Sequence, residues 1–593
     1  MSPEHPGPQP RGGANALVSF GARLVRSMVV LAVSPRHTRL PESSRLQQAR
    51  VQPPPTGSEK PVGQGGTSMD LTSLVAFAVG FGESAVRLLM LPFRNLLPRL
   101  PVARRPAPVT AIFEGLRVLQ PLIARSAQRM QGPLSRFAIV VALTLGVLLL
   151  PTPEGLTPQG HRALALFVFT GSILALEPVS LPIAALMVAM AQVALGIGTT
   201  QQGFEPFSRP VVFLILASLF LAEALRSHKL TRRLALLTIV ASGGGIRKLL
   251  LGLMSIAAVL SMWVENTATA AVLIPVALTI SKQIPDPKKA RRLLVLLVLG
   301  IAYAASLGGM VTIMGAASNA VASGFLVQIR RWTFVSWFVY GLPSFLLLFP
   351  LTFWLLLRMV PIDIPRLDVD PAREEVQKLG PMGPADWEII WTMIVAAFFW
   401  VGGSFIEPAL GLPPTMLSAA MVAVGAVAYL AVRQILNWED VKGVSWGIFL
   451  IIGAGLSLGE ALNRTGATNW FAGIITPLVT GPPLFVSMMI LVYLSALLTN
   501  VMNNTTIAAV FVPILINLAQ ADPTLNPVQL VLPVTLATTF GYSLPSASGR
   551  MALIAATGIV NRNEMMRYGI VMTIVSSGVL AVFFYVLALL KWV

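Results

Sequence analysis

The chain contains no cysteine and very little charge. The absence of cysteine among its 593 residues excludes disulfide bonds, thiolate zinc sites, iron–sulfur clusters and a cysteine nucleophile. There are only four histidines, and none is paired with another at metal-ligand spacing. Charged residues make up 11% of the chain, against about 25% in soluble proteins, while 55% of the residues are hydrophobic and the mean hydropathy is +0.75. These figures exclude a soluble multi-domain enzyme and indicate a polytopic membrane protein.

Much of the charge that is present lies near the N-terminus. Residues 1–136 hold 17 Lys and Arg against 6 Asp and Glu, and they are rich in Pro, Gly and Ser, a composition typical of disorder. Within this leader, residues 71–100 predict an amphipathic helix on the membrane surface. We interpret the leader as a cytoplasmic segment attracted to anionic lipids of a bacterial inner membrane. The alternatives are that the leader is a transit peptide, or that it lies upstream of a true start at Met69. No nucleic-acid partner is expected.

From residue 137 onward, apolar segments follow one another closely. Several are shorter than the roughly 20 residues that a helix needs to cross a bilayer, and others are interrupted by Gly, Pro or Asn. Such segments are typical of re-entrant hairpins and unwound helices that line a polar site. Two longer runs, 234–263 and 469–499, are each taken as one candidate span. The mixed-charge stretch 358–388 predicts a linker between a first membrane repeat, 137–370, and a second, 371–593.

Two sequence patterns recur at almost the same offset. The Glu-Ala-Leu at Glu223 returns 237 residues later at Glu460. The segment ENTATAAVLIP, 265–275, is matched 238 residues later by NNTTIAAVFVP. Each is followed by a loop of small residues, 308–319 in the first copy and 541–551 in the second. The agreement predicts an internal repeat.

The recurring Asn-Thr pairs place amide and hydroxyl groups at membrane depth. A helix that begins there presents free N–H groups and the positive end of its dipole, which suits an anion. Carbonyl groups of Gly-rich loops suit a small hard cation such as sodium. One such pair by itself is well explained as a contact between transmembrane helices, but two matched pairs, each with its loop, predict a transport site.

At these residues the chain resembles the divalent anion/sodium symporter family of sodium–dicarboxylate and sodium–sulfate carriers. The family's Ser-Asn-Thr motif, present in each repeat, is matched by Glu265-Asn266-Thr267 and Asn503-Asn504-Thr505. The segments 174–197 and 207–225 are also similar to it, so the resemblance covers about residues 137–593. It implies an all-α polytopic membrane protein with about eleven transmembrane helices, two re-entrant hairpins, an inverted repeat, a homodimeric scaffold and an elevator-type mechanism.

The resemblance also implies roles for individual residues. Substrate oxygens would be contacted by Asn266, Thr267, Asn504 and Thr505, with Ser548 in a closing loop. Sodium would be the coupling ion, and its candidate ligands are Ser261, Glu265, Asn266, Gly309, Thr499, Asn503 and Asn504.

Two charged residues depart from the family pattern. Glu265 stands where the family's motif has serine, and the neutral Asn503 stands at the same place in the other repeat. Arg550 is a charged residue within the second small-residue loop. Buried charges at membrane depth are costly and usually functional. Arg550 is a candidate substrate ligand through bidentate hydrogen bonds, or a fixed charge in place of a sodium ion. Glu265 is a candidate sodium ligand or proton acceptor, and a direct pair between the two residues is the structural alternative.

The predicted function is secondary active transport of a small divalent oxyanion, a dicarboxylate such as succinate or malate, or sulfate, by sodium symport. Sodium-independent exchange, proton coupling and a passive channel stay open as alternatives. The G-x-S-x-G pattern at 443–447 matches serine hydrolases, with Ser445 as nucleophile, but no histidine follows it. No Walker A pattern is present, so an ATP-driven pump is not expected, and the protein is expected not to be an enzyme.

Overall fold

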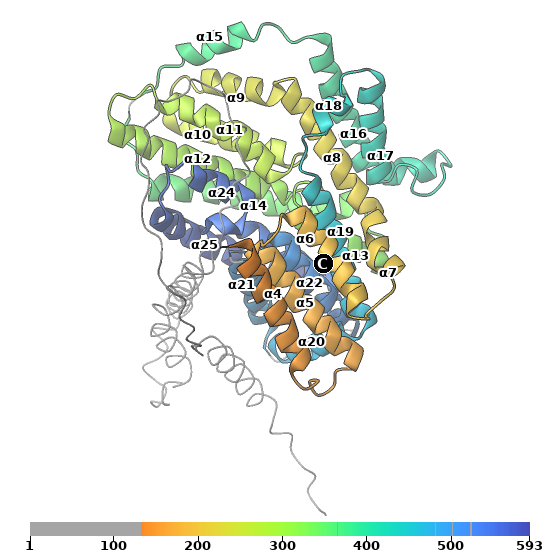
Figure 1. Ribbon diagram of the computed structural model, residues 1–593. Coiled ribbons are helices and arrows are strands. Elements are labelled where there is room, and N and C mark those ends of the chain that lie inside the picture. The colour runs from red at the N-terminus through yellow and green to blue at the C-terminus, as the bar shows by residue number, and fades with distance from the viewer. Residues whose placement is uncertain (1–131, 365, 481, 501, 522–524, 593) are drawn as a thin grey trace, which may run out of the picture. The chain divides into compact units, whose positions relative to one another are not determined.

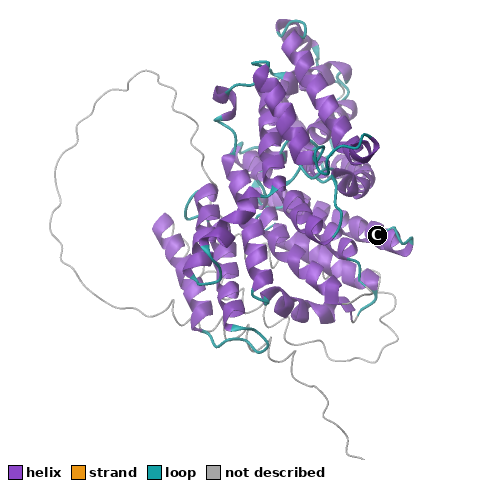
Figure 2. Cartoon of the chain, turned by 90° about the vertical axis from the view of Figure 1, so that its right-hand side faces the viewer, coloured by secondary structure: helices purple, strands orange, loops and turns teal. Residues whose placement is uncertain are grey.

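The computed structural model describes residues 132–592, except 365, 481, 501 and 522–524. Within these residues every regular element is a helix (Figures 1 and 2), which confirms the predicted all-α fold. The helix predicted at 71–100, and the rest of the leader up to residue 131, lie outside the described residues. The first described helix begins at Pro133, four residues before the predicted start of the membrane domain.

The helices fall into two series, separated by the mixed-charge stretch. The first series is α4 (Pro133–Leu149), α5 (Pro158–Leu176), α6 (Leu181–Ala194), α7 (Thr200–Phe204), η2 (Glu205–Ser208), α8 (Pro210–Ser227), α9 (Leu230–Ala241), α10 (Ile246–Ser261), α11 (Asn266–Ser281), α12 (Pro287–Gly309), α13 (Ala317–Ile329), α14 (Phe334–Met359) and α15 (Asp370–Lys378). The second is α16 (Pro384–Ala409), α17 (Ala419–Val432), α18 (Trp438–Val441), α19 (Trp446–Arg464), α20 (Ala467–Thr480), α21 (Leu484–Thr499), α22 (Asn504–Ala521), α23 (Pro527–Ala537), η3 (Thr538–Phe540), η4 (Pro545–Ala547), α24 (Gly549–Ala556) and α25 (Arg562–Leu589).

Six of the described helices are long and apolar enough to cross a membrane: α8, α12, α14, α16, α19 and α25. By contrast, α10, α11 and α21 have only 16 residues each, too few to cross a bilayer of about 30 Å alone. These short helices are the ones that flank the Asn-Thr pairs. Helix α12 is almost entirely buried along its apolar part, so it lies inside the protein.

The two long apolar runs, 234–263 and 469–499, are each divided between two helices. In the first, α9 ends at Ala241 and α10 begins at Ile246. Between them Gly243 and Gly244 adopt φ values of 59° and 77°, which glycine reaches without steric cost. A Cβ at Gly244 would also lie 2.1 Å from the Leu367 carbonyl oxygen. In the second run, a Pro-Pro pair precedes α21. Hydropathy does not register either break, because glycine and proline interrupt the backbone without adding charge.

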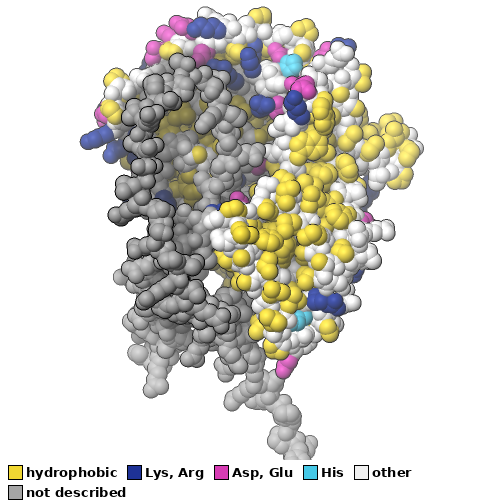
Figure 3. All heavy atoms as spheres, viewed as in Figure 1, with side chains coloured by type: hydrophobic (Ala, Val, Ile, Leu, Met, Phe, Trp, Pro, Cys, Tyr) yellow, Lys and Arg dark blue, Asp and Glu magenta, His cyan; other side chains and the backbone are white. Residues whose placement is uncertain are grey.

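The outer surface of the described part is apolar over much of its height. Figure 3 shows hydrophobic side chains over the visible middle of it and charged side chains toward its upper and lower ends. On α16, Trp387, Trp391, Phe398 and Phe405 are between 50% and 68% exposed. Exposed aromatic side chains in such numbers are costly in water and favourable in lipid, so this surface is suited to a bilayer.

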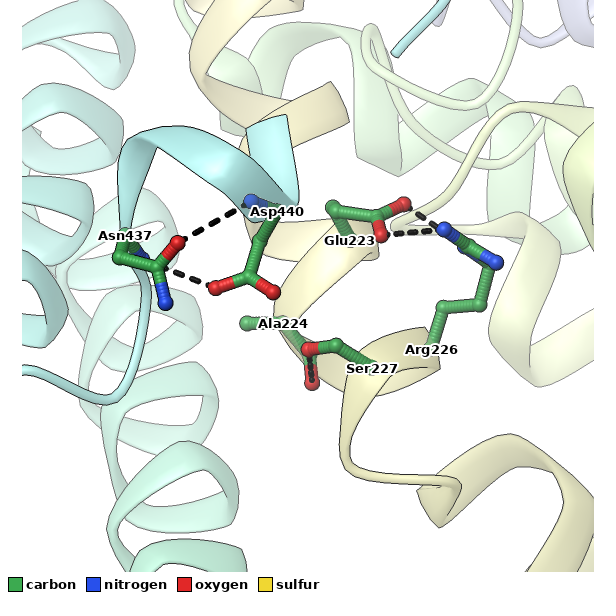
Figure 4. A network of polar contacts seen from close by, with 6 residues as sticks. All are labelled: Glu223, Ala224, Arg226, Ser227, Asn437 and Asp440. Atoms are coloured by element: carbon green, nitrogen blue, oxygen red, sulfur yellow. Dashed lines mark hydrogen bonds and ion pairs between the residues drawn. The ribbon is translucent and has the colours of Figure 1, made fainter. Parts of the chain in front are cut away.

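The recurring glutamates Glu223 and Glu460 each bind an arginine. Both carboxylate oxygens of Glu223 accept hydrogen bonds from Arg226, at 2.5 and 2.8 Å (Figure 4). Glu460 accepts one from Arg209 at 2.7 Å. Because each carboxylate already has a charged partner at a helix end, both glutamates are explained by these ion pairs.

Corresponding helices of the two series pack in the same combinations. Helix α12 packs on α10, α11 and α14, just as α23 packs on α21, α22 and α25. Many contacts join the two series, and among them α11 packs on α24 and α13 packs on α22. This correspondence agrees with an internal repeat, while the inversion of the repeats and an elevator movement stay predictions.

Candidate functional site

Both Asn-Thr pairs lie at the start of a helix. Helix α11 begins at Asn266, directly after Glu265, and α22 begins at Asn504, directly after Asn503. Glu265 caps α11 by accepting hydrogen bonds from the backbone N–H groups of Thr267 (2.8 Å) and Ala268 (3.2 Å), and from the Thr267 hydroxyl (3.0 Å). The Asn503 side chain caps α22 in the same manner, by accepting from the Thr505 N–H at 2.9 Å. The two residues that replace the motif serines are therefore both N-caps, and neither side chain contacts the oxygen clusters described next.

A first oxygen cluster surrounds the amide of Asn266. One terminal atom of this amide lies 2.5 Å from Ser261 Oγ, 2.9 Å from the Gly315 carbonyl oxygen and 3.0 Å from the Ala305 carbonyl oxygen. With nitrogen in that place, the amide donates to both carbonyls. The oxygens of Ser261, Ala305 and Gly315 are thus gathered around one point, and they are ligands of the kind that a small cation prefers. Gly309 closes the cluster, because a Cβ there would lie 2.1 Å from the Asn266 side chain.

A second oxygen cluster lies at the corresponding place in the other series. The Thr499 hydroxyl is 2.5 Å from Asn504 Oδ1 and 2.6 Å from the Thr538 carbonyl oxygen. Gly541 stands beside it, since a Cβ there would be 3.2 Å from the Thr499 carbonyl oxygen. Thr505 is buried and lies on the side of α22 that faces Gly455 of α19.

The short helix η3 connects the elements around both clusters. The hydroxyl of Thr538 lies 3.0 Å from that of Ser318, the second residue of α13. Arg550 of α24 donates from Nη2 to the Thr539 carbonyl oxygen at 2.8 Å. Asn500 and Thr573 both donate to the Phe540 carbonyl oxygen. The starts of α13, α22 and α24 therefore meet at one turn.

The start of α24 also touches the start of α11. A Cβ at Gly549 would lie 2.8 Å from Thr267 Oγ1, so the two backbones approach closely there. Ser548, next to Gly549, has a buried hydroxyl oxygen without a hydrogen-bond partner among the described residues. Gly549 and Ala268 are both exposed, so this contact borders an accessible surface. Four helix starts thus converge near residues that a solute can reach.

Arg550 is the most buried cation of the site, with 2% of its surface exposed. Its Nε has no hydrogen-bond partner within the described part of the chain. The candidate pair with Glu265 is not formed, because no N···O distance of 4.0 Å or less joins the two side chains. They interact only electrostatically. Since leaving a charged donor buried and unpaired costs free energy, Arg550 is suited to bind an anion.

The structure thus places most of the predicted residues around two clusters and one contact. Ser261, Asn266 and Gly309 belong to the first cluster and Thr499 and Asn504 to the second. Thr267 and Ser548 lie on either side of Gly549. Sequence reasoning missed Ala305 and Thr538, whose carbonyl oxygens complete the clusters. Aligning the repeats at the start of their small-residue loops, Gly308 with Gly541, would have placed Ala305 opposite Thr538.

Ser445, the candidate hydrolase nucleophile, is exposed at the start of α19 and makes no side-chain capping bond. Of the described histidines, His161 contacts Thr152 and Val147, and His228 contacts Asp386 and Ile435. Neither histidine forms a hydrogen bond with Ser445, so the arrangement of a serine hydrolase is not present among the described residues.

Several known proteins similar to this chain are named as transporters. It is 30% identical over 432 residues, 72% of its length, to an uncharacterized transporter of Haemophilus influenzae, 92% of which is covered. It is 26% identical to the sodium-dependent dicarboxylate transporter SdcS of Staphylococcus saprophyticus, with 76% of this chain and 91% of the relative covered. Among solved structures, the YdaH transporter of Alcanivorax borkumensis matches with a TM-score of 0.45 and 14% identity, covering 78% of this chain and 97% of that one.

The chain also matches the model of a protein family. Residues 132–592, nearly the whole described part, match the family described as the sodium:sulfate symporter transmembrane region. The expectation that the protein is a transporter and not an enzyme is confirmed by this match. The chain is an integral membrane protein that belongs to the sodium:sulfate symporter family.

Proposed function

We propose that the protein is a secondary active carrier of small divalent oxyanions, either dicarboxylates such as succinate and malate or sulfate, and that sodium drives uptake by symport. The observation that carries the proposal is the convergence of four helix starts, α11, α13, α22 and α24, around two clusters of neutral oxygens. Helix starts and the Arg550 guanidinium attract the anion, and converging carbonyl, amide and hydroxyl oxygens suit sodium.

Each group has a distinct task in this proposal. Thr267, Ser548 and Arg550 contact the substrate oxygens where α11 meets α24, with Asn266, Asn504 and Thr505 at the adjoining helix starts. Sodium is held in the first cluster by Ser261, Asn266 and the carbonyls of Ala305, Gly309 and Gly315. The named relative SdcS, a sodium-dependent dicarboxylate transporter, supports both the substrate class and the ion.

The movement and assembly are part of the same proposal. The helices that carry both clusters move together as an elevator against the remaining helices, which form the scaffold of a homodimer. The protein resides in a bacterial inner membrane with its basic N-terminal segment in the cytoplasm, as the positive-inside rule favours.

The test is uptake of labelled succinate, malate, citrate and sulfate into proteoliposomes, with inward gradients of sodium, of potassium as a control, and of protons. We expect saturable uptake of at least one of these anions, stimulated by sodium and not by potassium. Absence of both uptake and exchange for all four anions would contradict the carrier proposal. Conductance too large for a carrier would indicate a channel.

Sodium-independent exchange is the second candidate, and the buried charge of Arg550 favours it. In that case preloaded succinate would drive counter-flow of labelled succinate without sodium, and a sodium gradient would add nothing. Stimulation by a proton gradient alone would instead point to Glu265 as a proton acceptor.

A further inference from the structure

The two halves of the site match in backbone structure but differ in charge at two corresponding positions. The first position is the N-cap before each Asn-Thr pair, which is Glu265 in α11 and Asn503 in α22. The second is the second residue of the helix that follows each small-residue loop, which is Ser318 in α13 and Arg550 in α24. One half therefore carries an added negative charge and the other an added positive charge.

The first position places the negative charge beside the first oxygen cluster. Glu265 directly precedes Asn266, whose amide lies at the centre of that cluster. Its carboxylate is half-buried and is held by two backbone N–H groups and one hydroxyl. At the corresponding position, Asn503 makes the same kind of cap without a charge. The glutamate is thus not required for capping, and its charge adds attraction for a cation nearby.

The second position places the positive charge beside the second oxygen cluster. Arg550 Nη2 is bound to the Thr539 carbonyl oxygen, and the carbonyl of the preceding residue, Thr538, is part of that cluster. Ser318, the counterpart of Arg550, is a neutral hydroxyl that contacts Thr538. A fixed cation one peptide unit away from a cluster of oxygens opposes the binding of a second cation there, and the opposition is strong where water is excluded.

We infer that the protein binds one sodium ion per chain, in the first cluster, and that Arg550 replaces a second sodium ion at the second cluster. The inference rests on the proposed sodium-coupled function and specifies its stoichiometry. Each divalent anion then moves with a single sodium ion, while the fixed charges of Glu265 and Arg550 balance one another.

The experiment is equilibrium binding of radioactive sodium to the purified full-length chain, so that the readout does not depend on transport. We expect one sodium ion per chain in the unaltered protein. Arg550→Met, which removes the charge and keeps much of the volume, should bind two, whereas Arg550→Lys, which keeps the charge, should bind one. Glu265→Asn, which keeps the cap, should weaken sodium binding on the order of tenfold or more. Arg358→Gln is the control, because Arg358 lies over the ring of Trp354, away from both clusters.

Two sodium ions in the unaltered chain, or one in Arg550→Met, would overturn the inference. If Arg550→Met does not fold, as judged by size-exclusion chromatography, the number of sodium ions bound by the unaltered chain tests the inference alone: one ion supports it and two overturn it. Absence of sodium binding together with anion uptake would overturn the inference but leave the carrier, whereas absence of uptake for every anion would overturn the proposed function itself.

Discussion

Gly549, the first residue of α24, lies directly against Thr267 of α11, although the two residues come from opposite halves of the chain. A Cβ at position 549 would stand 2.8 Å from both Oγ1 and Cγ2 of Thr267. Threonine is short and branched at Cβ, so it cannot move aside as the end of a long side chain would. The contact therefore sets how closely the two halves approach at the candidate substrate site.

Gly549→Ala should reduce the initial rate of anion uptake by about tenfold, because an overpacked contact costs on the order of 1–3 kcal/mol. The measurement is uptake into proteoliposomes at matched protein content. Gly473→Ala is the control, since nothing lies within 4 Å of a Cβ there. The double change Gly549→Ala with Thr267→Ser removes the threonine methyl and should recover part of the rate. Normal uptake by Gly549→Ala would show that the contact does not limit transport.

Gly315→Ala should abolish the effect of sodium. A Cβ at 315 would stand 2.4 Å from the Gly309 carbonyl oxygen and 2.7 Å from that of Ser261, so it would fill the first cluster. We expect sodium to raise the melting temperature of the unaltered protein in detergent and to leave that of Gly315→Ala unchanged. Gly425→Ala, a change in open space on α17, should respond to sodium normally. A full sodium response in Gly315→Ala would rule out the first cluster as the sodium site.

Asn504→Ala should lower uptake by on the order of a hundredfold or more, because it removes an oxygen from the second cluster and an amide from a helix start. The protein should still elute as a single species in size-exclusion chromatography. Asn526→Ala is a matched control: Asn526 also lies at a helix start, where it accepts a hydrogen bond from the Val528 N–H at 2.9 Å. Its loss should cost about 1 kcal/mol of stability with uptake retained. Equal loss of uptake in both variants would contradict a specific role for Asn504.

Ser445→Ala should leave uptake and stability unchanged. Its side chain is exposed and makes no capping bond, so its removal deletes no contact of the fold. The same proteoliposome assay provides the measurement, with a parallel assay of ester hydrolysis on the purified protein. Ester hydrolysis that disappears in Ser445→Ala would revive the hydrolase interpretation.

Much of the architecture follows from residue patterns alone. Short apolar segments broken at Asn-Thr pairs predict helices that begin at membrane depth, and α11 and α22 do begin at Asn266 and Asn504. The breaks at Gly243–Gly245 and at the Pro-Pro pair before α21 are different, because hydropathy averages over them. Treating these glycines and prolines as helix-breaking residues would have divided both runs.

The partners of buried side chains are harder to predict. Glu265 and Arg550 carry opposite charges near one site, yet Glu265 caps its own helix and Arg550 binds the carbonyl of Thr539. Which of these contacts forms depends on where two distant segments cross, and residue type does not encode it. Carbonyl ligands such as those of Ala305 and Thr538 are harder still, because any residue can supply a carbonyl and only the backbone path selects one.

The turn η3 also constrains the length of the chain. Its three successive carbonyl oxygens are each contacted by side chains from other helices, namely Thr499, Arg550, and Asn500 with Thr573. A 3₁₀-helix has three residues per turn, so inserting or deleting one residue would rotate every later carbonyl by about 120°. Insertions can be accommodated in the loop between α16 and α17, where residues are mostly exposed, but at η3 a single added residue would redirect all of these contacts at once. Tags and reporter domains for studying this protein should therefore be inserted in the loop between α16 and α17.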